Sequence, residues 1–520
     1  MPFNSPFTSV TIPDVGLASY VLDDLSPQDE GRRAVVDYDS GDVLTYGQLT
    51  QAVDAFADAV AGELCPGEVV ALIGPNSARW VVAYLGCLRA GIVVTPLNTL
   101  ATVDEIAKQI TGSAAALVYC DASTATVARS GAEISGLANN SVRELSGVSL
   151  YPDESIHAPV RLVSDPGSHL AVVPYSSGTT GVPKGVMLSH RNLVANLCQL
   201  DDSLDVTTDS VVVGLLPFSH IYGMSVVLNL SLRRRATIVT MRSFSLESLL
   251  AVIQTERATH LPVAPPVMVA LAKAPSVSDF DISSVQVVLS GAAPLDAVLA
   301  KTVEDRLGCA VRQAYGMTEM SPVSHIAPLS VAAIPAESVG LTVANMTCKL
   351  VDPANGVEYD IPSSGVSLPG ELWCKGPNIM LGYLNNSAAT ADTLDSNGYL
   401  HTGDIAVVDS AGAITIVDRL KELIKYKGYQ VAPAELEGIL LTHEMIVDAA
   451  VVGQPLGNGD EAPHAFVVRA VGSGLSESAV VAHVEERVAP YKKVRRVTFV
   501  DTIPKSASGK ILRRSLRQPS

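Results

Sequence analysis

Hydrophobic residues in the first 400 positions follow two different spacings. Residues 49–60 carry apolar side chains at helical spacing behind a capping-box signature formed by Thr45 and Gln48. Residues 69–73 are an unbroken apolar run, as expected of a buried strand. The alternation returns further along, with apolar runs at residues 170–175 and 285–289. Helices that alternate with continuous apolar strands predict layered α/β structure with largely parallel sheets.

The pattern changes near Asp418, where residues 418–427 crowd charged side chains into a short segment. The residues after it have the pattern of a separate, compact α+β unit. A charged segment with few apolar anchors is typical of a linker or hinge. We therefore predict two domains, residues 1–418 and residues 419–520, with a charged helix face inside one domain as the alternative.

Composition and charge narrow the class of protein. Of 520 residues, 48% are hydrophobic and 17% are charged, which provides apolar material for a large core divided among more than one domain. The formal net charge of −17 indicates a soluble protein that does not bind nucleic acid. A nucleotide or coenzyme phosphate would then need a local cationic site, because the overall field repels it.

The seven cysteines indicate reduced core thiols in a cytoplasmic protein. Their number is odd and no C-x-x-C pair occurs, so neither a disulfide framework nor a zinc site is expected. They are Cys65, Cys87, Cys120, Cys198, Cys309, Cys348 and Cys374. No basic residue precedes Arg32, so we expect no secretory signal.

One stretch has the hydropathy of a membrane span. Residues 210–232 contain no Lys, Arg, Asp or Glu, and a run of three arginines follows them. However, Pro217, His220 and Gly223 interrupt the middle, and a lipid-facing helix tolerates such breaks poorly. We expect a buried pocket wall here and no membrane span.

Residues 175–190 read YSSGTTGVPKGVMLSH and form the strongest candidate for a phosphate site. They follow a predicted strand and precede a predicted helix, where α/β sheets bind ligands. The glycines allow a ligand close to the backbone, the hydroxyls add hydrogen-bonding groups, and Lys184 adds a mobile charge. The spacing fits neither a Walker A loop nor G-x-G-x-x-G. A polar turn without a ligand is the alternative interpretation.

Further motifs follow in order along the chain. They are PFSHIYG (217–223), SGAAPL (290–295), QAYGMTE (313–319), GELWCKGPNIMLGYL (370–384), GYLHTGDIAVVD (398–409), DRLKELIKYKGYQVAPAELE (418–437) and IPKSASGKILRR (503–514). Together with the glycine-rich segment, this series resembles the adenylate-forming superfamily. Among the acyl-CoA synthetases, the residues of these motifs are most similar to those of the 4-coumarate–CoA ligases.

The resemblance implies a fold and a reaction. It implies a large N-terminal domain of stacked α/β sheets with a small β-subdomain, and a small, mobile α+β C-terminal domain that rotates between two half-reactions. ATP and Mg²⁺ would convert a small carboxylic acid into an acyl-AMP, and coenzyme A would then take the acyl group. The implied acid is aromatic and hydroxycinnamate-like, or of medium chain length.

The resemblance also assigns residues to roles. Lys510 would bridge the α-phosphate and the attacking carboxylate, and Glu319 would bind Mg²⁺ with Thr318 beside it. Asp404 would accept from both ribose hydroxyls, and Arg419 would donate to the ribose and phosphate. A charged pair between Asp404 and Arg419 is the alternative. The other implied nucleotide and coenzyme contacts are Ser176, Ser177, Gly178, Thr179, Thr180, Lys184, Gly291, Ala292, Ala293, Gln313, Ala314, Tyr315, the hinge residue Lys421, Lys425, Lys427, Gly428 and Gln430.

The acid site is where this chain departs from the 4-coumarate–CoA ligases. The implied contacts with the acid are His220, Tyr222, Val226, Ala292, Ala314 and Met320, and His220 and Thr180 join Lys510 and Glu319 as catalytic residues. The methyl groups of Ala292 and Ala314 should narrow the pocket floor. Leu289 and Ser243 stand where lysines are expected, which puts hydroxycinnamate specificity and the coenzyme A acceptor in question.

Two features leave alternatives open. Arg233 to Arg235, with Arg242, either face the coenzyme phosphates or form a solvated basic turn. The acceptor is either coenzyme A or another group, such as a carrier-protein thiol or an amine. The short passage from His401 to Lys427 has no insertion, which favours coenzyme A. A luciferase-like oxygenase or an inactive paralogue is disfavoured, because the motif lysines and carboxylates are intact.

Overall fold

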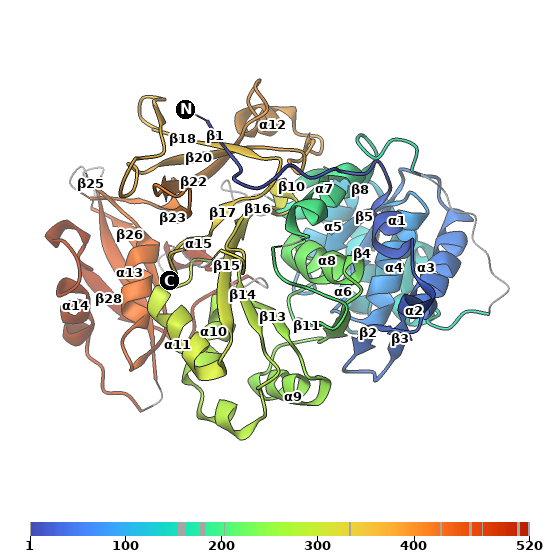
Figure 1. The fold of residues 1–520 in the computed structure, drawn as a ribbon, viewed down its shortest axis with the longest axis horizontal. Helices are drawn as coiled ribbons and strands as arrows, with labels where there is room; N and C mark the ends of the chain where they lie inside the picture. The colour runs from blue at the N-terminus through green and yellow to red at the C-terminus, as the bar shows by residue number, and fades with distance from the viewer. Residues whose placement is uncertain are drawn as a thin grey trace.

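The computed structural model describes residues 2–153, 163–176, 183–201, 203–331, 334–426, 429–456, 460–470, 472–506 and 510–517. Figure 1 shows a large body of layered sheets and helices, a small sheet above it, and a C-terminal unit at its left side. These three parts match the predicted large α/β body, β-subdomain and smaller α+β unit.

The first large sheet has eight strands in the order β21-β10-β8-β5-β4-β6-β7, with β9 paired to β10. Its strands are β4 (Val69–Ile73), β5 (Val93–Leu97), β6 (Ala115–Cys120), β7 (Val142–Glu144), β8 (Leu170–Val172), β9 (Tyr175–Ser176), β10 (Lys184–Ser189) and β21 (Gly382–Tyr383). The strands from β8 to β7 run parallel. Along β4, Val70 and Leu72 face one hydrophobic cluster and Ala71 and Ile73 face another, which explains the unbroken apolar run.

The second large sheet has nine strands in the order β17-β16-β15-β14-β13-β11-β12-β2-β3. They are β2 (Arg33–Asp37), β3 (Val43–Thr45), β11 (Val211–Gly214), β12 (Thr237–Thr240), β13 (His260–Val263), β14 (Val287–Ser290), β15 (Ala310–Gly316), β16 (Val323–Ile326) and β17 (Leu341–Thr342). The six strands from β15 to β2 are parallel, so their carboxyl ends share one edge.

Helices fill the space between the two large sheets. One hydrophobic cluster joins side chains of both sheets to these inner helices: α1 (Leu17–Leu22), α3 (Tyr46–Ala61), α4 (Ala78–Arg89), α7 (His190–Leu200) and α8 (Leu230–Arg233). The predicted capping box is present at the start of α3. A Cβ atom on Gly86 of α4 would lie 2.7 Å from Cδ1 of Phe56 in α3, so glycine lets these helices pack closely.

Two further groups of helices cover the outer faces. On the first sheet lie α5 (Val103–Ser113) and α6 (Ala125–Ile134), and on the second lie α9 (Leu246–Glu256), α10 (Pro265–Lys273) and α11 (Ala297–Leu307). The other helix of the body, α2 (Pro27–Glu30), caps one end beside β2.

The apolar stretch at residues 210–232 is a buried wall of the body, as predicted. It forms β11, the π-helical turn η4 (Tyr222–Asn229) and the start of α8, with the η4 side chains all buried. In the described parts of the chain no helix is both long and apolar enough to cross a membrane. All seven cysteines are free thiols, and Cys65 differs from the predicted core thiols because it is exposed.

The small sheet has six strands in the order β1-β18-β20-β22-β23, with β19 paired to β18. They are β1 (Phe3–Asn4), β18 (Thr347–Val351), β19 (Glu358–Tyr359), β20 (Gly370–Lys375), β22 (Leu400–Val408) and β23 (Ile414–Arg419), and α12 (Ser387–Thr393) lies next to them. Every pairing is antiparallel, and β1 adds a strand from the N-terminus to strands that lie between residues 347 and 419.

The C-terminal unit has its own hydrophobic cluster. It contains β24 (Ile424–Tyr426), β25 (Tyr429–Val431), β26 (Ile446–Pro455), β27 (Glu461–Arg469), β28 (Arg496–Phe499), α13 (Pro433–Leu441), α14 (Glu477–Glu485) and α15 (Arg513–Arg517). The charged helix face considered for residues 418–427 is wrong for the described residues 418–426, which form the end of β23, a turn and β24. Leu423 at the end of the turn and Ile424 at the start of β24 are both buried, whereas Lys421 and Lys425 are exposed.

Candidate active site

The glycine-rich segment closes a hairpin. Ser176 on β9 is the register partner of Lys184 on β10, so its two ends are held opposite each other. Four of the predicted phosphate contacts, Ser177, Gly178, Thr179 and Thr180, lie outside the described residues. The helix predicted to start near Ser189 is confirmed, because α7 begins at His190 with Ser189 as its N-cap residue. The strand β10 forms the second half of the segment and leads directly into this helix.

Glu319 lies in a short turn, η6 (Thr318–Met320), and its side chain is buried. Its Oε1 atom accepts hydrogen bonds from Ser176 Oγ and from Tyr383 OH, each over 2.9 Å. Among the described residues, no lysine or arginine forms an ion pair with this carboxylate. A buried carboxylate held only by neutral donors needs a cationic partner, so a divalent cation fits this position.

A network of buried amides holds the turn that carries Glu319. Asn378 Nδ2 donates to the Met320 carbonyl over 2.7 Å and to the Val323 carbonyl over 3.2 Å. Asn196 on α7 donates to the same Val323 carbonyl over 2.7 Å, and its Oδ1 atom accepts from the Val323 N–H over 3.1 Å. The turn is therefore fixed to the helix that follows the phosphate hairpin, which sets Glu319 relative to that hairpin.

A second polar group lies where β22 and β23 pair. Asp404 and Arg419 are register partners, and Arg419 Nε lies 3.3 Å from Asp404 Oδ1. Tyr315 on β15 donates from its hydroxyl to Asp404 Oδ2 over 2.6 Å. Burial, together with the Asp404 charge, raises the pKa of Tyr315 well above its usual value, so the phenol stays protonated as a donor. A strand of the body and the small sheet thus meet at one carboxylate.

Other predicted nucleotide contacts lie at the carboxyl ends of β14 and β15. Gly291, Ala292 and Ala293 follow β14 directly, and Ala314 lies on β15. Gln313 is buried, and its side-chain amide donates to the Ala336 carbonyl over 2.6 Å, so its nucleotide contact stays a prediction. Its side chain anchors a loop in this structure.

The predicted acid pocket gathers around η4. Tyr222 donates from its hydroxyl to the Leu289 carbonyl over 3.0 Å, and its ring fills the space where a Cβ atom on Gly291 would lie. Burial and, secondarily, the nearby Lys510 charge lower the pKa of His220 to about 4, so this imidazole is neutral at pH 7. Val226 lines a small apolar cavity with Leu289. Met320 is fully buried in the inner hydrophobic cluster.

Lys510 reaches this site from the C-terminal unit. Burial is the main cause that lowers its pKa, to about 8, with the Arg419 cation adding to the shift and the Asp404 and Glu319 carboxylates opposing it. Lys510 therefore lies close enough to Arg419, Asp404, Glu319 and His220 for their charges to affect one another. Its main chain is held by Ser506, whose hydroxyl accepts from the Lys510 N–H over 3.2 Å.

The residues predicted for the hinge and for coenzyme A are brought together less closely than the residues above. Lys421 is exposed on the turn after β23, and Lys425 is exposed on β24. Lys427 and Gly428 lie outside the described residues, and Gln430 is described only as the register partner of Lys425.

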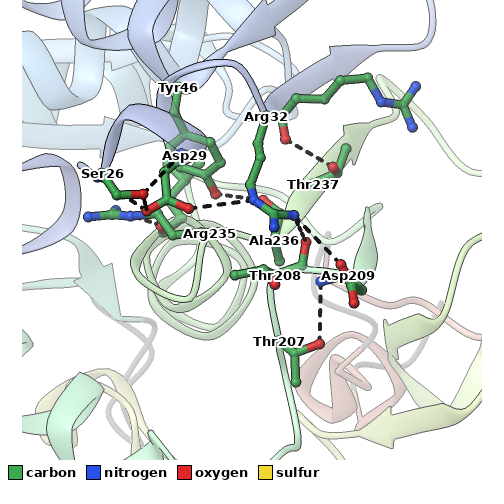
Figure 2. A network of polar contacts seen from close by, with 12 residues as sticks. Ser26, Asp29, Arg32, Tyr46, Thr207, Thr208, Asp209, Arg235, Ala236 and Thr237 are labelled. Atoms are coloured by element: carbon green, nitrogen blue, oxygen red, sulfur yellow. Dashed lines mark hydrogen bonds and ion pairs between the residues drawn. The ribbon is translucent and has the colours of Figure 1, made fainter.

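The run of arginines has a structural role. Arg235 is buried, and its guanidinium donates to the carbonyls of Val21, Leu232 and Asp23. Figure 2 shows it beside Tyr46, with Ser26 and Asp29 close by. Arg233 donates to the Tyr20 carbonyl, Arg234 to the Val206 carbonyl, and Arg242 pairs with Asp121. Carbonyl and carboxylate partners therefore hold these side chains. A coenzyme contact or a solvated turn stays a prediction for the exposed Arg242 and the half-buried Arg233 and Arg234.

Sequence reasoning missed Tyr383 and Asn378 as parts of the site. Both lie in the motif at residues 370–384, but the motif alone assigned them no role. Their partners are far away in the sequence, so only the folded chain identifies them.

Comparisons with known proteins agree with this geometry. Residues 24–384 match the model of the AMP-binding enzyme family, and residues 435–510 match that of the AMP-binding enzyme C-terminal domain. The chain is 40% identical to 4-coumarate–CoA ligase 5 of Oryza sativa subsp. japonica, over 99% of this chain and 96% of the relative. The match to the family model spans more than half of the chain.

Solved structures show the same fold. ATP-bound MatB from Rhodopseudomonas palustris is 29% identical, with a TM-score of 0.85 over 97% of this chain and 98% of that one. The amide bond synthetase McbA from Marinactinospora thermotolerans is 26% identical, with a TM-score of 0.83 over 96% of this chain and 98% of that one. The chain therefore belongs to the AMP-binding enzyme family, as an ATP-using, AMP-forming acid–CoA ligase similar to the 4-coumarate–CoA ligases.

Proposed function

We propose that this ligase activates a compact aromatic or medium-chain acid at the pocket between His220, Tyr222 and Ala314, and that coenzyme A is the acceptor. The observation that carries the proposal is the convergence of Lys510 with Glu319, Asp404 and the neutral His220. Acyl-adenylate formation requires a cation, a carboxylate that can bind a metal ion and a carboxylate that can bind the ribose.

In the first half-reaction the acid carboxylate attacks the α-phosphorus of ATP, and pyrophosphate leaves. The chain's task is to align the reactants and neutralise charge. Lys510 would hold the attacking carboxylate against the α-phosphate, and Lys184 would hold the outer phosphates. Asp404 would accept from the ribose hydroxyls, with Tyr315 and Arg419 fixing its orientation. Glu319, beside Thr318, would hold Mg²⁺, which supplies further charge neutralisation when bound.

The proposed acid follows from the side chains around the pocket. Neutral His220, the Tyr222 ring and the methyl groups of Ala292 and Ala314 offer an apolar, narrow space. An aromatic or medium-chain tail fits these surroundings better than a second carboxylate does.

For the second half-reaction we propose that the C-terminal unit, residues 419–520, turns about Lys421 relative to residues 1–418. Lys427 and Gly428 would then line the path of coenzyme A, with Lys425 and Gln430 near AMP. The separate hydrophobic cluster of this unit supports a boundary near Asp418. The free thiols agree with a cytoplasmic location.

A different acceptor is the second candidate. The likeness to McbA, whose name describes amide bond synthesis, favours testing amines, and a carrier-protein thiol belongs in the same test.

One experiment tests the proposal. Pyrophosphate release is measured over a panel of aromatic and aliphatic acids, with coenzyme A, with an amine or with no acceptor, and the products are identified by mass spectrometry. Acid-dependent release with an acyl-CoA product is the expected result. An amide product, or release without transfer to coenzyme A, would overturn the coenzyme A assignment.

A further inference from the structure

Tyr383 connects the phosphate hairpin with the turn that carries Glu319. It lies on β21, whose register partner on β10 is Val186, so it is two residues along the ladder from Lys184. Its N–H donates to Thr390 Oγ1 over 2.9 Å, and the residue is buried. The backbone and the ring of Tyr383 are therefore both fixed.

The two ends of the Tyr383 side chain meet opposite charges. Its hydroxyl donates to Glu319 Oε1 over 2.9 Å. Its ring face lies under Lys184, with Nζ 4.7 Å from the ring centroid. The ring thus lies between a cation and an anion that, in the described part of the chain, form no ion pair with each other.

The hydrogen bonds to Glu319 are unevenly divided. Ser176 Oγ and Tyr383 OH both reach Oε1, and among the described residues no donor reaches Oε2. One carboxylate oxygen is therefore anchored by neutral donors, while the full negative charge and the second oxygen remain for a ligand. A direct Lys184–Glu319 pair would instead consume both charges.

We propose that Tyr383 is a positioning residue: its hydroxyl aims Glu319 at the metal of a metal–polyphosphate, and its ring keeps Lys184 from pairing with Glu319. The inference rests on the proposed roles of Glu319 and Lys184. It adds a specific requirement, since both parts of the Tyr383 side chain are needed, and the hydroxyl can be removed without the ring.

Metal binding tests the proposal directly. Binding of Mn²⁺ to the full chain with α,β-methylene-ATP is followed by electron paramagnetic resonance, and the Mg²⁺ dependence of pyrophosphate exchange is measured in parallel. Tyr383→Phe keeps the ring and loses the hydroxyl, so we expect Mn²⁺ affinity to fall about 10- to 150-fold, as for one hydrogen bond to a charged group. Its kcat should recover at high Mg²⁺.

Tyr383→Leu removes the ring as well. Lys184 can then approach Glu319, so we expect a larger fall in Mn²⁺ affinity, a raised KM for ATP, and no recovery at high Mg²⁺. Tyr399→Phe is the matched control, because the Tyr399 ring also lies under a lysine, with Lys349 Nζ 4.5 Å from its centroid. This control should bind Mn²⁺ as the wild type does, and thermal melting confirms that each variant is folded.

Glu319→Gln separates the inference from the proposed function. Loss of Mn²⁺ binding in Glu319→Gln with wild-type binding in Tyr383→Phe would overturn the role of Tyr383 alone. Wild-type binding in Glu319→Gln would overturn the metal assignment, and the inference with it. An equal loss in Tyr383→Phe and Tyr399→Phe would also overturn the inference, because the effect would then be general to tyrosine hydroxyls.

Discussion

Tyr315 and Asp404 share a hydrogen bond of 2.6 Å, which joins a strand of the large body to a strand of the small sheet. We expect Tyr315→Phe to raise the Kd for AMP about tenfold, because a hydrogen bond to a charged group is worth roughly 1.5–3 kcal/mol and Asp404 would lose part of its orientation. Isothermal titration with AMP measures the change. Tyr359→Phe is a control, since that phenol also donates to an aspartate, Asp352, in the small sheet. Equal affinities in wild type and Tyr315→Phe would contradict the role of this contact.

The pKa of Lys510, lowered to about 8 by burial first and by Arg419 second, predicts a pH dependence. The lysine is a cation below this pKa and neutral above it, and only the cation can neutralise the α-phosphate. The kcat/KM for ATP in pyrophosphate exchange should therefore fall above about pH 8, since this parameter reports the free enzyme. Lys510→Arg stays charged, so its residual activity should not show this fall. If kcat/KM of the Lys510→Arg variant fell above about pH 8 as it does in the wild type, the pH dependence would belong to another group.

Ala292 has a positive φ of 72°, which is unfavourable for any residue with a Cβ atom. Ala292→Gly removes roughly 1–2 kcal/mol of this strain but adds a comparable conformational entropy to the unfolded chain, so stability should change little. The lost methyl group should widen the acid pocket and improve kcat/KM for ring-substituted acids several-fold over unsubstituted ones. Competition assays with paired acids measure this ratio. Ala293→Gly is the neighbouring control, and an equal ratio in both variants would place the acid elsewhere.

Asn378 satisfies two buried carbonyls of the turn around Glu319. Asn378→Ala leaves the Met320 carbonyl without this donor, whereas the Val323 carbonyl keeps its hydrogen bond from Asn196. We therefore expect a loss of about 1–3 kcal/mol in the free energy of unfolding, as for one unsatisfied buried group. Denaturant unfolding measures it, with the exposed Asn397→Ala as control. A loss below about 1 kcal/mol would show that the network relaxes around the change.

Lys273 joins α10 of the body to the C-terminal unit. Its Nζ donates to the Ile446 carbonyl over 3.0 Å and to the Leu441 carbonyl over 3.3 Å. If the C-terminal unit turns away for thioester formation, Lys273→Met should slow pyrophosphate exchange a few-fold and leave thioester formation from supplied acyl-AMP unchanged. Assays that are quenched at fixed times measure the rate of each half-reaction, with Lys301→Met on α11 as control. Equal slowing of both half-reactions would argue against a moving unit.

Local signals predicted the layers of the fold well. The capping box at Thr45 and the apolar run of β4 depend on neighbouring residues, and both were confirmed. The helix predicted to start near Ser189 was confirmed by α7. The pairing of β10 with β8, β9 and β21 was not predicted, because it depends on strands elsewhere in the chain.

The site was predictable only where a motif carried the information. Asp404 and Arg419 were named from separate motifs, and their pairing follows from the β22–β23 register. Tyr383 and Asn378 act through partners that lie far away along the chain, which no local pattern reveals. Arg235 shows the converse, since a basic run that looked available to a ligand is occupied by backbone carbonyls.

The position of Arg419 at the end of β23 has a mechanical consequence. The chain leaves the small sheet there and enters the C-terminal unit through residues 420–423. For a body that turns about a fixed point, displacement grows with distance from that point. If the C-terminal unit turns about Lys421 as proposed, Arg419 and its partner Asp404 would lie near the pivot and stay almost stationary, whereas Lys510, in the last segment of the chain, would travel far. A nucleotide held at the pivot could thus remain bound while the catalytic lysine is withdrawn.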